Sequence, residues 1–237
     1  MTKIQGLLLL LLTALALGSQ FPAYEVPSGG TTLPASPQRM GDPEAGYQYL
    51  LYGTMVDRGI PLEVYRKVSD GASADDLGRT GDSQGIPFAF NVVEAPNGVK
   101  VVAPTCLSCH AEKINGRLIL GLGNNTTDYT KEQGGSFRAA DFGVQLRFGK
   151  KSAEWEAYFP LSRGYKAVGP YIQTAVRGLN PADKIFAALA AHRKADDLHW
   201  LDEAQFDVPT EVVPTDVPAW WLLKKKNALY YNGLGLG

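Results

Sequence analysis

The pattern of apolar and polar positions predicts short helices joined by long loops. The first helix begins where Asp42 offers a capping oxygen, Pro43 fits the first turn and Glu44 lies near the positive end of the helix dipole. It is expected to stop by Gly59, and Asn180 is expected to cap the last helix. Further helices are predicted over 61–68, 152–158, 170–176 and 181–192.

Two Asn-Gly pairs predict tight turns next to short strands. Apolar runs at 88–93 and 99–102 flank the sequence Pro96-Asn97-Gly98, which is typical of a β-hairpin. A second turn at Asn115-Gly116 leads into a short strand over 117–120. Polar, Gly-rich loops are expected at 69–85 and 121–135. These elements together predict a mainly α fold with short β-hairpins and long loops.

The amino-terminal segment predicts export. Lys3 precedes an apolar run that is too short to cross a bilayer, because spanning needs about 20 residues, and small residues follow it at Ala16 and Gly18. We therefore expect a signal peptide over 1–18, a Pro/Gly/Ser-rich linker over 19–42 and one domain over 43–237. The protein is expected to be periplasmic or otherwise exported, with no stable membrane span after cleavage. An uncleaved membrane tether is the alternative.

Composition limits the classes of function. The 237 residues are 45% hydrophobic and 20% charged, as in an ordinary globular protein. The chain has 23 basic and 24 acidic side chains, a formal net charge of −1, and no basic run interleaved with aromatic residues. We therefore expect no nucleic-acid partner. Two Cys allow a single disulfide at most, which excludes a scaffold held together by several disulfides.

Those two cysteines form the motif that carries chemistry, Cys106-Leu107-Ser108-Cys109-His110. Two thiols three residues apart on one helical turn can each bond a vinyl group of the same haem, and the next residue, His110, then presents an imidazole nitrogen to the iron. Pro104 and Thr105 supply a helix start just before the motif. The spacing predicts one covalently attached haem c, with Cys106 and Cys109 as anchors and His110 as the proximal iron ligand.

Three other interpretations of the motif remain open. A thioredoxin-like redox pair needs a strand before the motif and a helix after it, and here a second Asn-Gly turn follows at once. A structural zinc site needs four ligands, but the chain has no second Cys pair, and His192 and His199 are distant in sequence. A plain disulfide between Cys106 and Cys109 is the third.

The sixth position of the iron has no obvious ligand, because no Met follows Cys109. Met40 and Met55 precede the motif, and Met55 is a weak candidate that also suits core packing. His192 closes an Ala-rich helix, where we expect a surface position or an interaction with the helix dipole, whereas His199, beside Trp200, is the better distal candidate. An open sixth position would allow peroxide or oxygen to bind, whereas two strong ligands favour electron transfer alone.

The exported leader, the haem motif and the tail together resemble a known family. The tail reads Val-Pro-Ala-Trp-Trp-Leu-Leu-Lys-Lys-Lys-Asn-Ala-Leu-Tyr-Tyr-Asn-Gly over 217–233. The chain is similar to the bacterial di-haem cytochrome c peroxidase-like superfamily, which includes the methylamine-utilisation enzyme and rubber oxygenases. The resemblance implies a cytochrome c-like fold, two haem-binding halves and, as partner, a redox protein or a second haem domain.

The chain departs from that family in having a single Cys-x-x-Cys-His motif. We expect it to be the amino-terminal portion of a longer di-haem protein; a mono-haem relative is the alternative. The tail has two interpretations as well. The resemblance implies that Trp220 and Trp221 relay electrons, whereas adjacent Trp residues are more often packing at a domain seam. Residues 224–226, three lysines, favour a solvated basic face, or else steer an acidic partner or neutralise haem propionates.

The sequence thus predicts a haem c-binding domain in electron transfer, as part of a peroxidase-like or oxygenase-like oxidoreductase. A haem-based binding or sensor module without turnover is the alternative function, and an exported domain without haem is a third. Arg117, Asn124 and Tyr129 follow the motif in or beside a Gly-rich loop and are candidates for hydrogen bonds to haem propionates.

Overall fold

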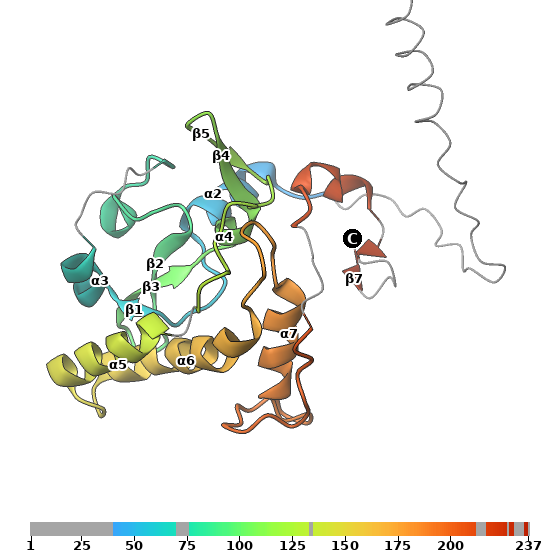
Figure 1. Ribbon diagram of the computed structural model, residues 1–237. Helices are drawn as coiled ribbons and strands as arrows, with labels where there is room; N and C mark the ends of the chain where they lie inside the picture. Colours follow the sequence, from blue (N-terminus) through green and yellow to red (C-terminus); the bar gives the residue numbers. More distant parts are fainter. Residues whose placement is uncertain are drawn as a thin grey trace, which may run out of the picture. The chain divides into compact units, whose positions relative to one another are not determined.

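A computed structural model describes residues 40–69, 76–132, 135–211, 217–226, 228–229 and 235–236. The described residues form a mixed α/β fold (Figure 1), 40% helical and 14% strand. The prediction of a mainly α, cytochrome c-like fold is therefore wrong. One strand ends at Pro104, just before the Cys-x-x-Cys-His motif, and another begins at Ala111, just after it. Hydrogen bonds between paired strands therefore determine the backbone on both sides of the motif. The predicted leader, and the linker up to residue 39, lie outside the described residues.

A three-stranded antiparallel sheet leads into the motif. Its strands are β1 (Ile60–Pro61), β2 (Phe90–Glu94) and β3 (Lys100–Pro104), in the order β1-β3-β2. The turn between β2 and β3 needs a glycine, because Gly98 has a φ of 84°. The predicted hairpin around Asn97-Gly98 is confirmed.

The first two predicted helices are confirmed as α2 (Pro43–Tyr52) and α3 (Leu62–Val68). The side chain of Asp42 accepts hydrogen bonds from the backbone N–H groups of Glu44 and Ala45, at 3.0 and 3.1 Å. This is the predicted cap, and it shows that the start of α2 is determined by neighbouring residues in the sequence.

Three longer helices follow the motif: α5 (Gly135–Phe148), α6 (Ala153–Val168) and α7 (Ala182–Ala191). The helix predicted over 152–158 continues through Pro160 to the end of α6, because its buried face, which includes Tyr158, extends past the proline. The helix predicted over 181–192 is confirmed as α7, but the N-cap position is Pro181 and not Asn180.

The helix predicted over 170–176 is wrong. Only the short 3₁₀ turn η2 (Gly169–Tyr171) forms there. The residues after it bond instead to the loop that follows the motif: the N–H of Thr174 donates to the carbonyl of Tyr129 at 2.9 Å, and the side chain of Gln173 donates to the carbonyl of Thr130 at 2.8 Å. This pairing with a distant loop takes the place of helical hydrogen bonds.

The remaining described elements are small. The motif itself contains a single helical turn, α4 (Leu107–His110). The others are η1 (Gly81–Ser83), β4 (Ala111–Ile114), β5 (Arg117–Leu120), η3 (Trp220–Lys225), β6 (Ala228–Leu229) and β7 (Gly235–Leu236). In these described segments β4 pairs antiparallel with β5, and β6 with β7.

Helix α6 joins two parts of the core. Ala157 is fully buried in a cluster with Ala95 and Val101 of the hairpin. At the other end of α6, Val168 belongs to a second cluster, with Ile172, Ala188, Ala191 and Val208. A third cluster, of Leu62, Ile86 and Val102, lies under α3. Because α6 belongs to two clusters, the sheet and α7 are held by the same helix.

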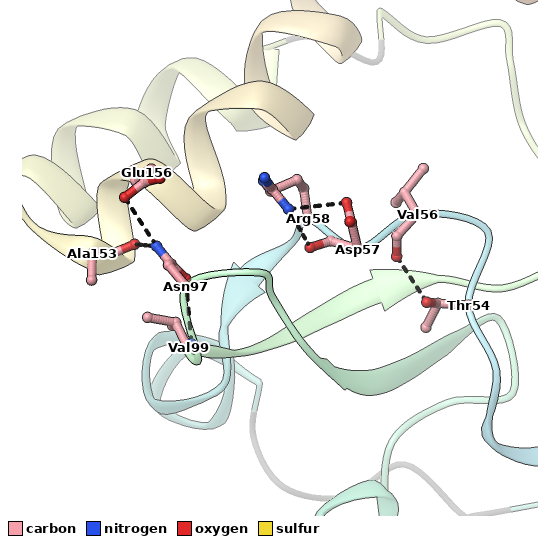
Figure 2. A network of polar contacts seen from close by, with 8 residues as sticks. All are labelled: Thr54, Val56, Asp57, Arg58, Asn97, Val99, Ala153 and Glu156. Atoms are coloured by element: carbon pink, nitrogen blue, oxygen red, sulfur yellow. Dashed lines mark hydrogen bonds and ion pairs between the residues drawn. The ribbon is translucent and has the colours of Figure 1, made fainter.

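Polar contacts also hold the sheet to α6 (Figure 2). Asn97, at the tip of the hairpin, donates from its side chain to the carbonyl of Ala153 at 2.9 Å and to the carboxylate of Glu156 at 3.3 Å. Just before β1, Arg58 pairs with Asp57 at 3.0 Å, a contact that the same figure draws.

Within the part of the chain that the structure describes, none of the helices combines the length and the apolar character needed to cross a bilayer.

Candidate functional site

The Cys-x-x-Cys-His motif begins where β3 ends. The backbone N–H of Thr105 donates to the carbonyl of Ala89 at 3.0 Å, and its hydroxyl donates to the carbonyl of Phe88, also at 3.0 Å. The N–H of Leu107 in turn donates to the Thr105 hydroxyl at 3.2 Å, and the Leu107 side chain is fully buried. These contacts fix the start of α4 against the sheet, so the position of the motif is set by the hairpin.

The two thiols and the imidazole come from one helical turn. The carbonyl of Cys106 accepts hydrogen bonds from the N–H groups of Cys109 and His110, at 3.3 and 3.0 Å. Side chains three and four residues apart lie on the same face of a helical turn. Both cysteines are free and half-buried. The two thiols and the imidazole thus come from a single helical turn at the end of β3.

His110 lies in a setting that favours its neutral form. Burial lowers the pKa of His110, and the carbonyl of Pro218 opposes this by favouring the protonated ring. Nδ1 is buried and, among the described residues, makes no hydrogen bond of good geometry. A neutral imidazole is the form that binds a metal, and ligating histidines commonly direct their second nitrogen at a backbone carbonyl.

The ring of His110 stacks on Trp220, with ring centroids 4.5 Å apart and an angle of 28° between the ring planes. Two backbone hydrogen bonds through Gly121 also connect Trp220 with His110. The N–H of Trp220 donates to the carbonyl of Gly121, and the N–H of Gly121 donates to the carbonyl of His110, each at 2.8 Å. The loop after the motif is thus bonded both to the motif and to the tail.

Two tyrosines and an asparagine complete the surroundings of Cys109. Burial raises the pKa of Tyr129 to about 12, and burial likewise raises the pKa of Tyr165; the charge of a Cys109 thiolate adds to both shifts. Tyr129 also packs against the apolar cluster that contains Val168. The N–H of Asn124 donates to the carbonyl of Cys109 at 2.8 Å. Two buried tyrosine hydroxyls therefore lie within electrostatic range of Cys109, and the loop after the motif is bonded to its backbone.

The predicted distal candidates lie in different places. The backbone N–H of Met55 donates to the carbonyl of Pro104 at 3.0 Å, which places Met55 beside the end of β3, but its side chain is 51% exposed. Met40 is almost fully exposed. His199 is exposed in the turn after α7, where its carbonyl accepts a hydrogen bond from the N–H of Lys194 and its own N–H donates to the carboxylate of Asp197, each at 2.9 Å.

His192 is buried rather than exposed, contrary to its predicted surface position. It stacks on Trp200, with ring centroids 5.0 Å apart, and its Nδ1 lies 2.8 Å from the carbonyl of Leu201. Both contacts tie the end of α7 to the following segment, so His192 has a structural role there.

The three propionate candidates also differ. Arg117 is exposed at the start of β5. The side-chain oxygen of Asn124 accepts hydrogen bonds from the N–H groups of Thr126 and Thr127, each at 3.0 Å, so it shapes its own loop. The structure brings two of the candidates to the motif: the N–H of Asn124 bonds to the carbonyl of Cys109, and the hydroxyl of Tyr129 lies within electrostatic range of the Cys109 thiol.

Several residues of the site have no local signal in the sequence. The stack of Trp220 on His110, and the places of Pro218 and Tyr165, depend on segments that are distant in the chain. The pair Gly121 and Gly123 offered a partial signal, since close approach of two backbones needs residues without side chains.

A strand, β4, follows the motif directly, whereas a thioredoxin-like redox pair requires a helix there. In the described ranges no group of three or more His, Cys, Asp and Glu side chains is gathered closely enough to hold a metal ion. No family model matches the chain, and neither the curated proteins nor the solved structures include a match.

Proposed function

We propose that the protein carries one haem c, attached through Cys106 and Cys109 and ligated by His110, and that it works in electron transfer. The observation that carries this proposal is the grouping of two half-buried free thiols and one half-buried imidazole on one helical turn. The carbonyl of Pro218 near the His110 ring and the two buried tyrosines around Cys109 also support it. When bound, the haem supplies a one-electron Fe(III)/Fe(II) couple.

The attachment step is balanced without an added oxidant. Each S–H would add across one vinyl C=C bond, so that a C–S bond forms at one carbon and the hydrogen goes to the other. The chain would contribute the two thiols of the Cys-x-x-Cys-His pattern, which is typical of c-type haem attachment, and His110 would contribute the proximal nitrogen. The protein mass therefore rises by the full mass of haem.

The proposed class of oxidoreductase is based on the haem motif and on the tail over 217–233. We propose that this domain belongs to a peroxidase-like or oxygenase-like oxidoreductase similar to the di-haem superfamily, and that it is exported. The tail that carries the resemblance includes Trp220, which stacks on His110, so the tail and the motif are in contact. The partner would be a redox protein or a second haem domain.

The experiment is expression with export in a host that matures c-type cytochromes, followed by intact-mass spectrometry and a haem stain of a denaturing gel. We expect a gain of about 616 Da, the mass of one haem attached through both thioethers, and a stained band. The double variant Cys106→Ala/Cys109→Ala should lose both signals. Ser108→Ala, inside the same motif, is the matched control and should keep them. An unstained wild-type band with the mass of the apoprotein would refute the proposal.

Binding of carbon monoxide to the reduced protein distinguishes electron transfer alone from catalysis or ligand sensing. If the reduced haem is six-coordinate and its spectrum does not change with carbon monoxide, the protein transfers electrons only, and both the catalytic and the sensor versions are excluded. A change in the spectrum shows a sixth position that can be vacated, which a peroxide- or oxygen-handling enzyme needs.

A further inference from the structure

The segment 217–221, here called the strap, lies against the motif from a distant part of the chain. Trp220 stacks on the imidazole of His110, with ring centroids 4.5 Å apart. Within the strap, Val217 is buried and Trp220 is half-buried, whereas Trp221 is 57% exposed. Two adjacent indoles therefore have different surroundings, and only Trp220 covers His110 among the ring contacts of the described residues.

Two glycines after the motif allow the strap to approach. A Cβ atom on Gly123 would lie 1.9 Å from the carbonyl oxygen of Val217, a distance that no side chain can adopt. A Cβ atom on Gly121 would lie 3.3 Å from the Cβ of Trp220, and Gly121 also has a φ of 80°. The strap can occupy its position only because Gly123 lacks a side chain, and Gly121 gives it further room.

We propose that Trp220 is a positioning residue for the iron ligand: the strap fixes the plane of the His110 ring and keeps water from the ring face that the indole covers. This inference rests on the proposed function, because it assumes that His110 ligates haem iron. A ligating imidazole is oriented by the groups packed around it, and its orientation and exposure to water tune the metal. Trp220 acts through His110 and is not itself required to touch the haem.

The direction of the effect follows from charge and solvation. The oxidised haem carries one more positive charge than the reduced haem, and water stabilises the more highly charged state. Removing the indole admits water to the ring, so the midpoint potential should fall. The ring also gains freedom to rotate, which broadens the electron paramagnetic resonance signal of the oxidised haem.

The test measures covalent haem, midpoint potential and the resonance spectrum of exported holoprotein in four variants. Trp220→Ala is expected to keep covalent haem, lower the potential and broaden the signal. Trp220→Phe keeps an aromatic face on the imidazole and should restore both properties. Trp221→Phe changes the exposed neighbour and should match the wild type. Gly123→Ala displaces the strap without touching the ring stack directly and should shift the potential in the same direction as Trp220→Ala.

The outcomes separate this inference from the proposed function. If the wild type contains no covalent haem, the proposed function fails and the strap has no iron ligand to position. If haem is attached but the potentials of Trp220→Ala and the wild type agree, the inference alone is overturned. An equal shift in Trp221→Phe would also overturn it. Should Trp220→Ala not fold by circular dichroism, Trp220→Leu, which fills space without a flat face, is measured in its place, and an unchanged signal width would refute the fixed ring plane.

Discussion

At the scale of single residues, Asp141 shows how a half-buried carboxylate is stabilised. Asp141, on α5, accepts hydrogen bonds from the hydroxyl of Ser162 and the ammonium group of Lys166, both on α6. Burial by itself would raise the pKa of Asp141, but the hydrogen bonds from Lys166, Ser162 and Tyr158 outweigh it, so the pKa is lowered. The charged carboxylate therefore contributes to holding α5 against α6.

Replacing this carboxylate should give a pH-dependent loss of stability. Asp141→Asn should lower the free energy of unfolding at pH 7 by about 1–3 kcal/mol, because a charged hydrogen-bond partner of Lys166 and Ser162 is lost. The folded pKa of Asp141 lies below its unfolded value of 3.8. The stabilisation is thus fully present above the unfolded pKa and disappears as pH falls through the folded pKa.

Urea unfolding of both proteins between pH 7 and pH 2.5 measures this difference. It should shrink only below about pH 4, the normal range of an Asp side chain. Asp196→Asn, which removes an exposed partner of Lys194, is the control and should be indistinguishable from the wild type. A difference that stays constant down to the lowest pH would contradict the charge-based account.

At the scale of elements, the helix α2 has a glycine where an alanine would fit. Gly46 lies inside α2 and is exposed, and a Cβ atom there would meet nothing within 4 Å. The start of the helix is already capped by Asp42. Glycine in such a position lowers helix stability because its unfolded backbone has more freedom to lose.

Gly46→Ala should therefore raise the free energy of unfolding by about 0.5–1 kcal/mol. Gly98→Ala is the opposite case within the same protein, since a φ of 84° in the hairpin turn strains any residue with a Cβ atom; it should lower the value by about 1–2 kcal/mol. Chemical denaturation of the two variants beside the wild type measures both signs. A stabilising Gly98→Ala, or a destabilising Gly46→Ala, would show that the backbone is not as described.

Sequence reasoning succeeded for elements whose signals are local. The Asp42 cap, the turn at Asn97-Gly98 and the helix α7 all depend on residues within a few positions of one another. It failed for residues 170–176, whose hydrogen bonds go to the distant loop around Tyr129. It also missed β4, because the residues just after His110 form a strand only through pairing with β5.

At the scale of the whole molecule, the stability of the described fold depends on the contact between α6 and the sheet β1-β3-β2. Gly59 lies between them: its N–H donates to the carbonyl of Ala157 at 3.1 Å, and a Cβ atom on it would lie 2.2 Å from the carbonyl oxygen of Val102. Because α6 contributes to the clusters around Val101 and Val168, a displacement at Gly59 affects both.

We expect Gly59→Ala to lower the free energy of unfolding by about 2 kcal/mol or more, since the backbone around it must shift. The loss should appear as one cooperative transition, with the same midpoint by far-ultraviolet circular dichroism and by Trp fluorescence. The tolerant Gly46→Ala serves as the matched control. Two separate transitions in Gly59→Ala would mean that the sheet and α7 are stabilised independently.

The sequence alone determined the chemistry-bearing motif and its local geometry. Cys106, Cys109 and His110 lie within five residues, so their placement on one turn follows from helical spacing. The tertiary structure decided the mixed α/β fold and the covering of His110 by Trp220. The physical reason is distance along the chain: spacing specifies contacts within a turn or hairpin, whereas a stack between distant residues forms only once the whole core has packed around them.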